Sequence, residues 1–532
     1  MVLHPIAQHD TPLLTALQHC ATRSTAPFHT PGHKRGAGID AALRGLLGDR
    51  VFQADLPELP ELDNLFAPSG VIQQAQDLAA QVFGAEETWF LTNGSTAGVI
   101  AAILATCQVG DKIILPRNVH QSAISGLVLS GAMPIWVTPE FDATWDLAHG
   151  VSVEAIAHAL HQHPEAKAVM LVSPTYLGVC SDVAAIAHLC HQHAIPLLVD
   201  EAHGPHFGHH PDLPISALQA GADLAVQSTH KVLSALTQAA MVHVQGELLN
   251  RDRLAKSLAL VQSTSPNYLL LASLDATRRQ IALQGQAFME HTLQLADAAR
   301  SQLSQIPGLR LLEALDLPGS FAGDRTRLTV HVAELGVDGF TADELLSQQW
   351  GVVAELPTLR HLTFIISLGN TQEDIKRLVQ SLEWLSQEAE KRSREPEYSG
   401  QKTKLTPSRP YASTPPPLYP STPPSPHAST APRPHSPTAP SVLSPRDAFF
   451  AAAETVPIHV AVNRISAELI CPYPPGIPVL VPGELITEAA IAALQTVLRA
   501  GGILSGGASP DLTSVKVVKV GPTSTPSPPS IG

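Results

Sequence analysis

Cysteine is scarce in this sequence of 532 residues, and its placement points to no structural bridge. The five cysteines are odd in number, lie far apart and form no C-x-x-C pair: Cys20, Cys107, Cys180, Cys190 and Cys471. Disulfide frameworks and zinc sites depend on paired, closely spaced thiols. We therefore expect no disulfide framework, no bound metal and a reducing compartment, the cytoplasm.

Charged residues are also few, and positive charge is the scarcer sign. They make up 15% of the chain, and Lys+Arg 33 against Asp+Glu 47 gives a formal net charge of -14. Proteins that bind nucleic acid neutralise phosphates with positive charge, so we expect no nucleic-acid partner. A cationic small molecule suits this negative field better.

Long hydrophobic runs are missing as well. No apolar run approaches the roughly 18 consecutive residues that a membrane-spanning helix needs. The start of the chain, Met1 to Pro5, lacks the basic and then apolar order of a signal peptide. We expect no membrane association.

Apolar residues are abundant at 44%, which is typical of a globular protein, and at about 150 residues per domain the chain should hold about three folded units. Fourteen of the 46 prolines lie between Pro407 and Pro445, interleaved with Ser, Thr and Ala, which indicates a flexible linker. We predict an N-terminal segment at 1–70, a large domain at 71–300, a small α/β domain at 301–395, a Pro-rich disordered linker at 396–445, a C-terminal α+β domain at 446–520 and a disordered tail at 521–532.

Between residues 71 and 244, helical periodicity alternates with short apolar runs. This pattern is typical of an α/β fold with a mostly parallel sheet covered by helices. The clearest cases are predicted helices at 153–163 and 183–193, followed by strands at 168–172 and 195–199. Both helices end in His-Gln-His. We favour an interaction of these histidines with the helix dipole over a metal site, since no Cys or carboxylate cluster accompanies them.

After Pro266 the pattern changes to one long predicted helix that runs to about residue 305. A smaller mixed segment follows, with predicted strands at 328–332 and 362–366. This arrangement favours a second, smaller α/β domain packed on the first.

Polar residues follow five of the predicted strands. They lie at 92–96, 118–120, 173–176, 200–203 and 228–231. Ligands of open α/β sheets bind at the carboxyl ends of the strands, where loops and helix N-termini converge. We therefore expect these residues to form one site.

Lys231 and Asp200 are the first candidates for chemistry at this site. Pyridoxal 5'-phosphate needs an amine for a Schiff base, an anion against its pyridine nitrogen, a flat group over its ring and donors around its phosphate. Lys231 would supply the amine and Asp200 the anion, although Asp200 could instead cap the next helix. Ala202 lies on the same side of an extended chain as Asp200 and leaves room for a ring. Glu201 points the other way, and His203 could contact the cofactor or substrate or be a loop histidine.

The run Gly94-Ser95-Thr96 opens a predicted helix at 97–106. Backbone N-H groups, two hydroxyls and the helix dipole together make a phosphate site, whereas ordinary capping would explain only one hydroxyl. Ser228 and His230 could add donors. His120, at the end of another strand, is the natural flat partner for the ring.

Ten short motifs can be compared with known families, in this order along the chain: Thr30–Gly36, Asn93–Thr96, Arg117–His120, Pro174–Gly178, Asp200–Gly204, Ser228–Lys231, Ser263–Tyr268, Arg464–Glu468, Pro472–Pro478 and Pro482–Glu484. Together they resemble the Orn/Lys/Arg decarboxylase family of pyridoxal-phosphate enzymes. The resemblance covers nearly everything except the Pro-rich linker and the tail.

The resemblance implies an aspartate-aminotransferase-like large domain and a homodimer or higher homo-oligomer with sites at subunit interfaces. It implies that Lys231 binds the cofactor, Asp200 pairs with the pyridine nitrogen and His120 stacks on the ring. The phosphate would be held by Ser95, Thr96, Ser228 and His230. Thr264 would reach the phosphate of a neighbouring subunit.

The family further implies decarboxylation of a basic L-amino acid in polyamine biosynthesis, with protonation at Cα by Lys231, His203 or a neighbouring group. No receiver-like domain precedes Thr30, and Gln121 stands where long members commonly carry Lys, so we expect the short, biosynthetic branch. The stretch from 403 to 444 would be an insertion. Arginine, giving agmatine and CO2, is the preferred substrate, with lysine and ornithine as alternatives.

Two other functions stay open at this stage. One is another enzyme of the same fold, an aminotransferase or an aldolase, although the motifs at Thr30–Gly36 and Pro472–Pro478 argue against it. The other is a non-catalytic oligomeric regulatory paralogue, against which the intact Lys231, Asp200 and His120 argue.

Overall fold

The computed structural model describes residues 7–319, 321–394, 443–473 and 475–519. The predicted Pro-rich linker, apart from its last three residues, and the predicted tail lie outside the described residues. Within the described part of the chain, no helix is both long and apolar enough to cross a bilayer.

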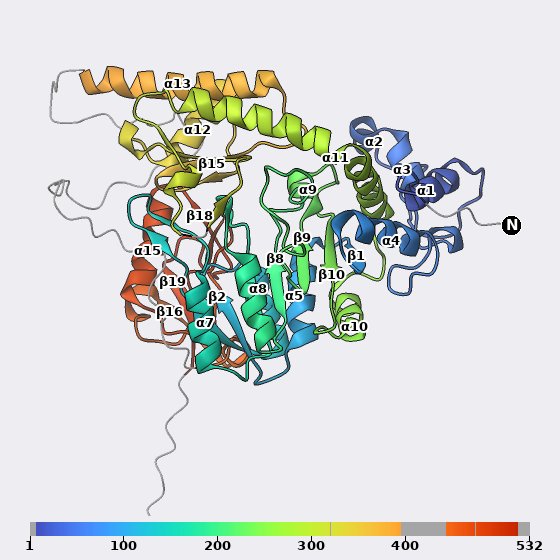
Figure 1. Ribbon diagram of the computed structural model, residues 1–532, viewed down its shortest axis with the longest axis horizontal. Coiled ribbons are helices and arrows are strands. Elements are labelled where there is room, and N and C mark those ends of the chain that lie inside the picture. The colour runs from blue at the N-terminus through green and yellow to red at the C-terminus, as the bar shows by residue number, and fades with distance from the viewer. Residues whose placement is uncertain (1–6, 320, 395–442, 474, 520–532) are drawn as a thin grey trace, which may run out of the picture.

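A seven-stranded sheet forms the centre of the molecule (Figure 1). In sheet order its strands are β1 (Glu87–Leu91), β10 (Ala240–Val244), β9 (Leu224–Gln227), β8 (Leu197–Asp200), β6 (Ala168–Val172), β2 (Lys112–Pro116) and β3 (Met133–Val137). The five strands from β9 to β3 are parallel, and β10 is antiparallel to both of its neighbours. The predicted α/β fold with a mostly parallel sheet is confirmed.

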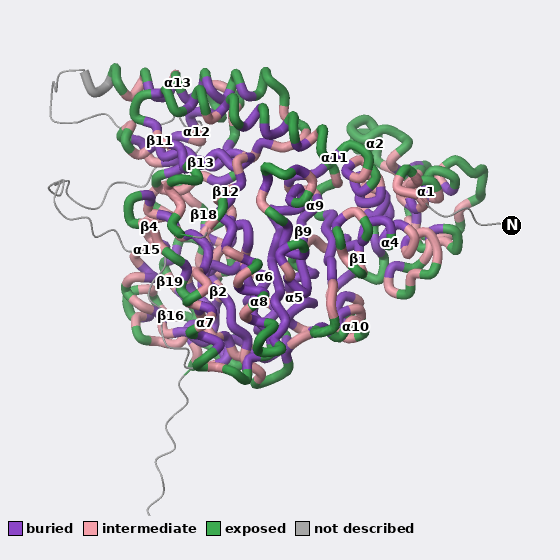
Figure 2. The backbone as a smooth tube through the Cα atoms, in the orientation of Figure 1, coloured by how far each residue is buried: buried purple, intermediate pink, exposed green. Residues whose placement is uncertain are grey.

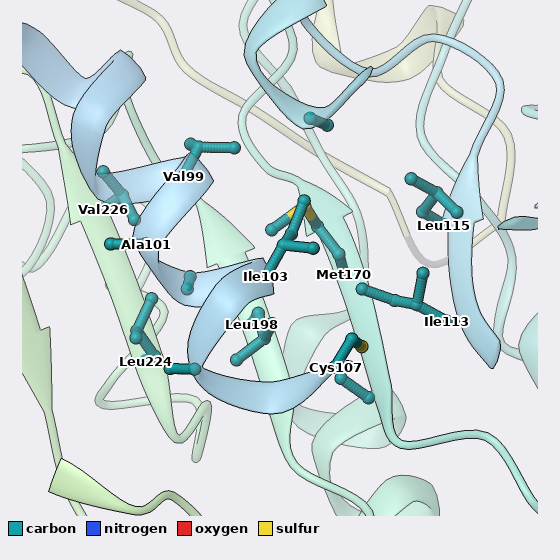
Figure 3. Packing of buried hydrophobic residues seen from close by; sticks show 14 of the residues in the cluster. Val99, Ala101, Ile103, Cys107, Ile113, Leu115, Met170, Leu198, Leu224 and Val226 are labelled. Carbon is teal, nitrogen blue, oxygen red and sulfur yellow. The ribbon is translucent and has the colours of Figure 1, made fainter. Parts of the chain in front are cut away.

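Helices cover both faces of this sheet. One face carries α5 (Gly94–Thr106), α6 (Gln121–Ser130) and α10 (Arg251–Val261), and the other carries α7 (Val153–Gln162) and α8 (Val183–Gln192). Side chains alternate along each strand, so Leu198 packs in the cluster with α5 while Leu197 and Val199 pack with α8. Figure 3 shows the first cluster, in which Ile103 of α5 lies next to Met170 of β6.

Two element boundaries differ from the prediction for local reasons. β8 begins at Leu197 and not at Ile195, because Pro196 has no N-H to donate to the ladder. α5 begins at Gly94 because Asn93 occupies the cap position. The Gly-Ser-Thr run is therefore the first helical turn, whose N-H groups have no partner within the helix.

The long predicted helix is α11 (Tyr268–Leu303), and it takes part in two hydrophobic cores. Its first half packs with α1 (Pro12–Thr22) and α4 (Val71–Phe83), and its last turns pack with the small domain. The predicted boundary between residues 300 and 301 lies inside this helix.

The small domain contains a four-stranded sheet, in the order β11 (Arg310–Leu311), β13 (Arg327–His331), β15 (His361–Ile365) and β14 (Leu356–Pro357), with α12 (Gly339–Trp350) and α13 (Gln372–Arg394). β13 and β15 each begin one residue before the predicted strand.

The C-terminal part has its own core. It contains α14 (Pro445–Phe450), β16 (Ala453–Pro457), β17 (Cys471–Tyr473), α15 (Glu488–Arg499), β18 (Ile503–Ser505) and β19 (Ser514–Val518), with β16 paired to β19 and β17 to β18. In Figure 1 it lies beside α7 and β2, below the small domain. Figure 2 shows that burial is concentrated along the central strands, whereas α2 (Ala41–Leu47) and α13 expose much of their surface.

The structure also contains several short elements: α3 (Asp49–Ala54), β4 (Phe141–Asp142), β5 (Leu147–Ala148), β7 (Val179–Cys180), α9 (Thr229–Val232) and β12 (Ala322–Gly323).

Candidate active site

Lys231 lies in α9, the short helix that directly follows β9, and its side chain is surrounded by aromatic groups. Its Nζ is 2.9 Å from Nε2 of His203 and 5.4 Å from the centre of the Tyr176 ring. The Tyr176 and His203 rings are themselves 4.6 Å apart, centre to centre. The structure thus brings together two predicted site residues, and Tyr176 of the predicted strand-end motif joins them.

Asp200 is the last residue of β8 and is buried. Among the described residues, its carboxylate accepts one hydrogen bond, from the Ala202 N-H at 3.2 Å. Burial raises the pKa of Asp200, and the positive charge of Lys231 acts in the opposite direction. The two groups therefore lie close enough to interact, and the buried carboxylate has capacity for another partner. Ala202 is buried beside it.

The protonation state of His203 follows from its contact with Arg327, a buried residue of β13. Nη2 of Arg327 donates to the carbonyl oxygen of His203 at 3.0 Å and lies 3.3 Å from Nδ1 of its ring. Because a guanidinium can only donate, Nδ1 is the acceptor, and the proton of the neutral ring is on Nε2.

Electrostatics agree with this assignment. Burial, followed by the charges of Lys231 and Arg327, holds the pKa of His203 well below its ordinary value. Burial also lowers the pKa of Lys231. A lowered pKa brings the neutral amine within easier reach, and this is the form that reacts with a carbonyl group.

His120 precedes α6 and caps it with its own ring, since Nδ1 accepts from the Ser122 N-H at 3.2 Å. Burial lowers the pKa of His120 to about 4, and the charge of Lys231 adds to this effect. The ring is therefore neutral at pH 7, and it belongs to the same pocket as Lys231.

The predicted phosphate residues converge on the N-terminus of α5. Ser228 Oγ donates to Ser95 Oγ at 2.7 Å, which joins the ends of β9 and β1. The hydroxyl of Thr229 is buried and has no partner among the described residues. Gly94 contributes the first N-H of the helix, and Thr96 is exposed beside it. Together these groups provide the donors that an anion would need.

Two further predicted residues are placed differently. His230 Nδ1 donates to the Ala239 carbonyl at 3.1 Å, so its Nε2 bears the lone pair when the ring is neutral. His230 can therefore donate to a phosphate only after it binds a second proton. Thr264 is exposed, and the N-H of its neighbour Ser263 donates to Asn93 beside the phosphate residues at 3.3 Å.

The residues present fit pyridoxal 5'-phosphate. Each part of that molecule has a matching group. The buried Asp200 carboxylate suits the pyridine nitrogen, and the Lys231 amine, whose pKa is lowered, suits the aldehyde. The neutral His120 ring suits the face of the pyridine ring, and the hydroxyls at the N-terminus of α5 suit the phosphate. The fit rests on residues that follow four of the five strands at which the sequence predicts the site.

Sequence analysis missed two charged residues of the small domain. Arg327 lies beside His203, and the negative charge of Glu355 partly opposes the lowering of the pKa values of Lys231 and Arg327 by burial. A mainly apolar cavity of about 210 Å³, lined in part by Tyr176, Leu356 and Pro475, lies where the large, small and C-terminal parts meet. No local motif marks these residues, because packing of distant segments places them there.

Comparison with known proteins agrees with this geometry. Residues 11–317 match the family described as Orn/Lys/Arg decarboxylase, major domain, and residues 435–506 match its C-terminal domain. An arginine decarboxylase of Bacillus subtilis is 38% identical to the chain, over 97% of the chain and 99% of its own length. An arginine decarboxylase of Halalkalibacterium halodurans is also 38% identical, over 96% of the chain and 98% of its own length.

Solved structures confirm the predicted fold class. The lysine decarboxylase LdcF of Francisella novicida superposes with a TM-score of 0.78 at 22% identity, over 96% of this chain and 81% of its own. Lysine decarboxylase A of Pseudomonas aeruginosa superposes with a TM-score of 0.78 at 23% identity, over 96% of this chain and 80% of its own. With its fold, its strand-end residues and both parts of its sequence in agreement, the chain belongs to the Orn/Lys/Arg decarboxylase family.

Proposed function

We propose that this decarboxylase uses pyridoxal 5'-phosphate to convert L-arginine to agmatine and CO2. Four relatives that are 35–38% identical over at least 90% of the chain are named arginine decarboxylase, whereas the relatives named lysine decarboxylase are 22–26% identical. The observation that carries the proposal is the partly buried contact between Lys231 and His203, with the buried Asp200 carboxylate close enough to interact with Lys231.

In this proposal Lys231 binds the cofactor, Asp200 holds the positive charge of its pyridine nitrogen, and the neutral ring of His120 covers its face. Ser95, Ser228 and the N-terminus of α5 hold its phosphate, with Thr96 and His230 beside them. When bound, the cofactor supplies an electron-poor ring that accepts the electron pair left at Cα as CO2 departs. His203 and Lys231 hold the proton that Cα then receives.

The substrate side chain needs a negative partner, and Glu355 is the candidate. Its charge acts on Lys231, Tyr176 and Arg327, so this exposed acid of the small domain lies near the residues of the site. A guanidinium binds a carboxylate through two parallel hydrogen bonds, whereas an ammonium makes a point contact. This chemistry accommodates arginine and leaves lysine and ornithine as weaker substrates.

We also infer a homodimer or higher homo-oligomer that acts in the cytoplasm in polyamine biosynthesis. Phe28, just before the Thr30–Gly36 motif, is 95% exposed, and Thr264 is exposed as well. A second copy that covers these segments would explain why family motifs lie on the surface. The family resemblance supports this assembly, with Thr264 at the neighbouring phosphate.

The decisive experiment follows amine and CO2 release from arginine, lysine and ornithine in parallel with the full chain and added pyridoxal 5'-phosphate. We expect the highest kcat/KM with arginine. A keto acid product would identify an aminotransferase instead. Cofactor binding without turnover of any of the three would support the non-catalytic alternative.

Replacement of the amine tests the chemistry directly. Lys231→Ala should lower kcat on the order of 10³-fold or more, because the nucleophilic amine is lost. The matched control is Lys256→Ala, which removes an exposed lysine of α10 and should leave kcat unchanged. Thermal denaturation verifies that both variants are folded. Turnover close to wild type in Lys231→Ala would refute the proposed mechanism.

A further inference from the structure

A loop of the C-terminal part contacts two active-site residues that come from different strand ends. The carbonyl of Gly476 accepts from the N-H of Gln121 at 3.0 Å, next to His120. The carbonyl of Pro475 accepts from the hydroxyl of Tyr176 at 2.8 Å. Two consecutive carbonyls of one loop therefore bind Tyr176, which contacts Lys231, and the residue next to His120.

Gly476 approaches His120 so closely that an added side chain would crowd the imidazole ring. Its φ of +85° lies in the region that favours glycine, and a Cβ added there would lie 3.3 Å from Nε2 of His120 and from Nε2 of Gln121. The opposite edge of the His120 ring is held by Ser122. The loop and the first turn of α6 thus enclose the imidazole between them.

The same strand end that carries His120 also holds the loop in place. Arg117 donates to the carbonyls of Pro478 at 2.8 Å and Val479 at 3.2 Å, and it pairs with Glu484 at 2.9 Å. Arg117 and Glu484 are both buried. A buried, charge-assisted pair of this kind tolerates little displacement, because separating the two charges would leave each of them unpaired.

We propose that the loop from Pro475 to Pro478 is a positioning element of the active site, which fixes the ring of His120 through Gly476 and the ring of Tyr176 through Pro475. The inference rests on the proposed function, in which His120 covers the ring of pyridoxal phosphate. The C-terminal part is then required for the pocket itself, and its role is not limited to stability.

Gly476→Ala tests the inference, with Gly501→Ala as the matched control. Both glycines lie in the C-terminal part with φ near +90°, but a Cβ at Gly501 would meet no atom within 4 Å. The control therefore carries the backbone strain without the contact. Tyr176→Phe is a second variant, which removes only the hydroxyl that binds Pro475.

The measurements are the Kd of pyridoxal phosphate for the apo-protein, the circular dichroism of the bound cofactor and the thermal midpoint. We expect Gly476→Ala to raise Kd ~10-fold relative to Gly501→Ala, because the added Cβ overpacks the contact with the His120 ring that covers the cofactor. We expect Tyr176→Phe to reduce the cofactor's circular dichroism at an unchanged thermal midpoint.

Equal Kd values and spectra for Gly476→Ala and Gly501→Ala would overturn the inference if wild type binds the cofactor normally. Should Gly476→Ala fail to fold, a wild-type cofactor spectrum in Tyr176→Phe would overturn it as well. Failure of wild type to bind pyridoxal phosphate is a separate result, because it refutes the proposed function and not the placement of the loop.

Discussion

At the scale of single residues, the electrostatics of the site depend on a chain of buried polar groups. Asp324 accepts from the hydroxyl of Thr326 at 2.6 Å, contacts His206 at 3.1 Å, and lies 3.9 Å from Nε of Arg327. Burial alone would raise the pKa of Asp324, but these partners hold that pKa far below its ordinary value. The acid therefore keeps its charge and holds Arg327 against His203.

Arg327→Met removes the donor to His203 and one positive charge near Lys231. Burial is the main cause that lowers the pKa of Lys231 and the charge of Arg327 adds to it, so loss of this charge should move the pH at which the amine becomes reactive upward. Amine labelling of Lys231 in the apo-protein across pH, read by mass spectrometry, measures this. Arg325→Met, which removes a more exposed neighbour, is the control. Identical labelling profiles for the two variants would contradict the role assigned to Arg327.

The site residues that directly follow strands could be predicted from the sequence. Those that only the packing of the small domain brings near the site could not. Lys231, Asp200 and His203 could be found because a parallel sheet gathers its strand ends. Arg327 and Glu355 stand in a different domain, more than 90 residues further along the chain, and their sequence surroundings are ordinary for a small α/β unit. Their contribution depends on how the small domain packs against the large domain, and the local sequence pattern does not determine this packing.

At the scale of elements, α5 determines where the phosphate residues lie. Its Gly98 faces the sheet, and a Cβ there would lie 2.7 Å from Val226 and 2.9 Å from Leu91 and Val242. The helix can therefore approach β9 closely enough for Ser95 to meet Ser228. The strand direction of β10 was not predicted, because an apolar run has the same pattern in either direction.

Gly98→Ala should destabilise the protein by about 1–2 kcal/mol, since the overlap with the sheet outweighs the roughly 1 kcal/mol that helix propensity gains. Gly45→Ala, in the interior of α2 with no atom within 4 Å of the added Cβ, should stabilise it slightly. Urea denaturation compares the free energies of unfolding. A stabilised Gly98→Ala variant would show that α5 does not pack as described.

At the scale of the whole molecule, buried neutral histidines should set the response to acid. Burial lowers the pKa of His120 and His209 to about 4 and that of His243 and His361 to about 3. Below about pH 6.5 the unfolded chain binds more protons than the folded one, so the free energy of unfolding falls as pH falls. Buried acids whose pKa values are raised, such as Glu201 (to about 8) and Asp200, act with the opposite sign, but among the described residues the histidines with lowered pKa values outnumber them.

We expect the urea midpoint to drop from pH 6.5 to pH 5, with each of these histidines contributing up to about 1.4 kcal/mol per pH unit. His243→Gln should flatten the dependence, whereas replacement of the exposed His158 should not. A midpoint that stays constant or rises over this range would refute the expectation.

The continuity of α11 has a consequence for how the enzyme moves. At about 1.5 Å per residue, its 36 residues form a rod of about 54 Å that begins in the core of the large domain and ends in that of the small one. The large and small domains are therefore joined by a continuous helix and not by a flexible linker at this junction. A tilt of the lobe that carries Glu355 and Arg327 would move the far end of the rod at Tyr268, and would thereby couple the surroundings of Lys231 to the amino-terminal helices that pack there.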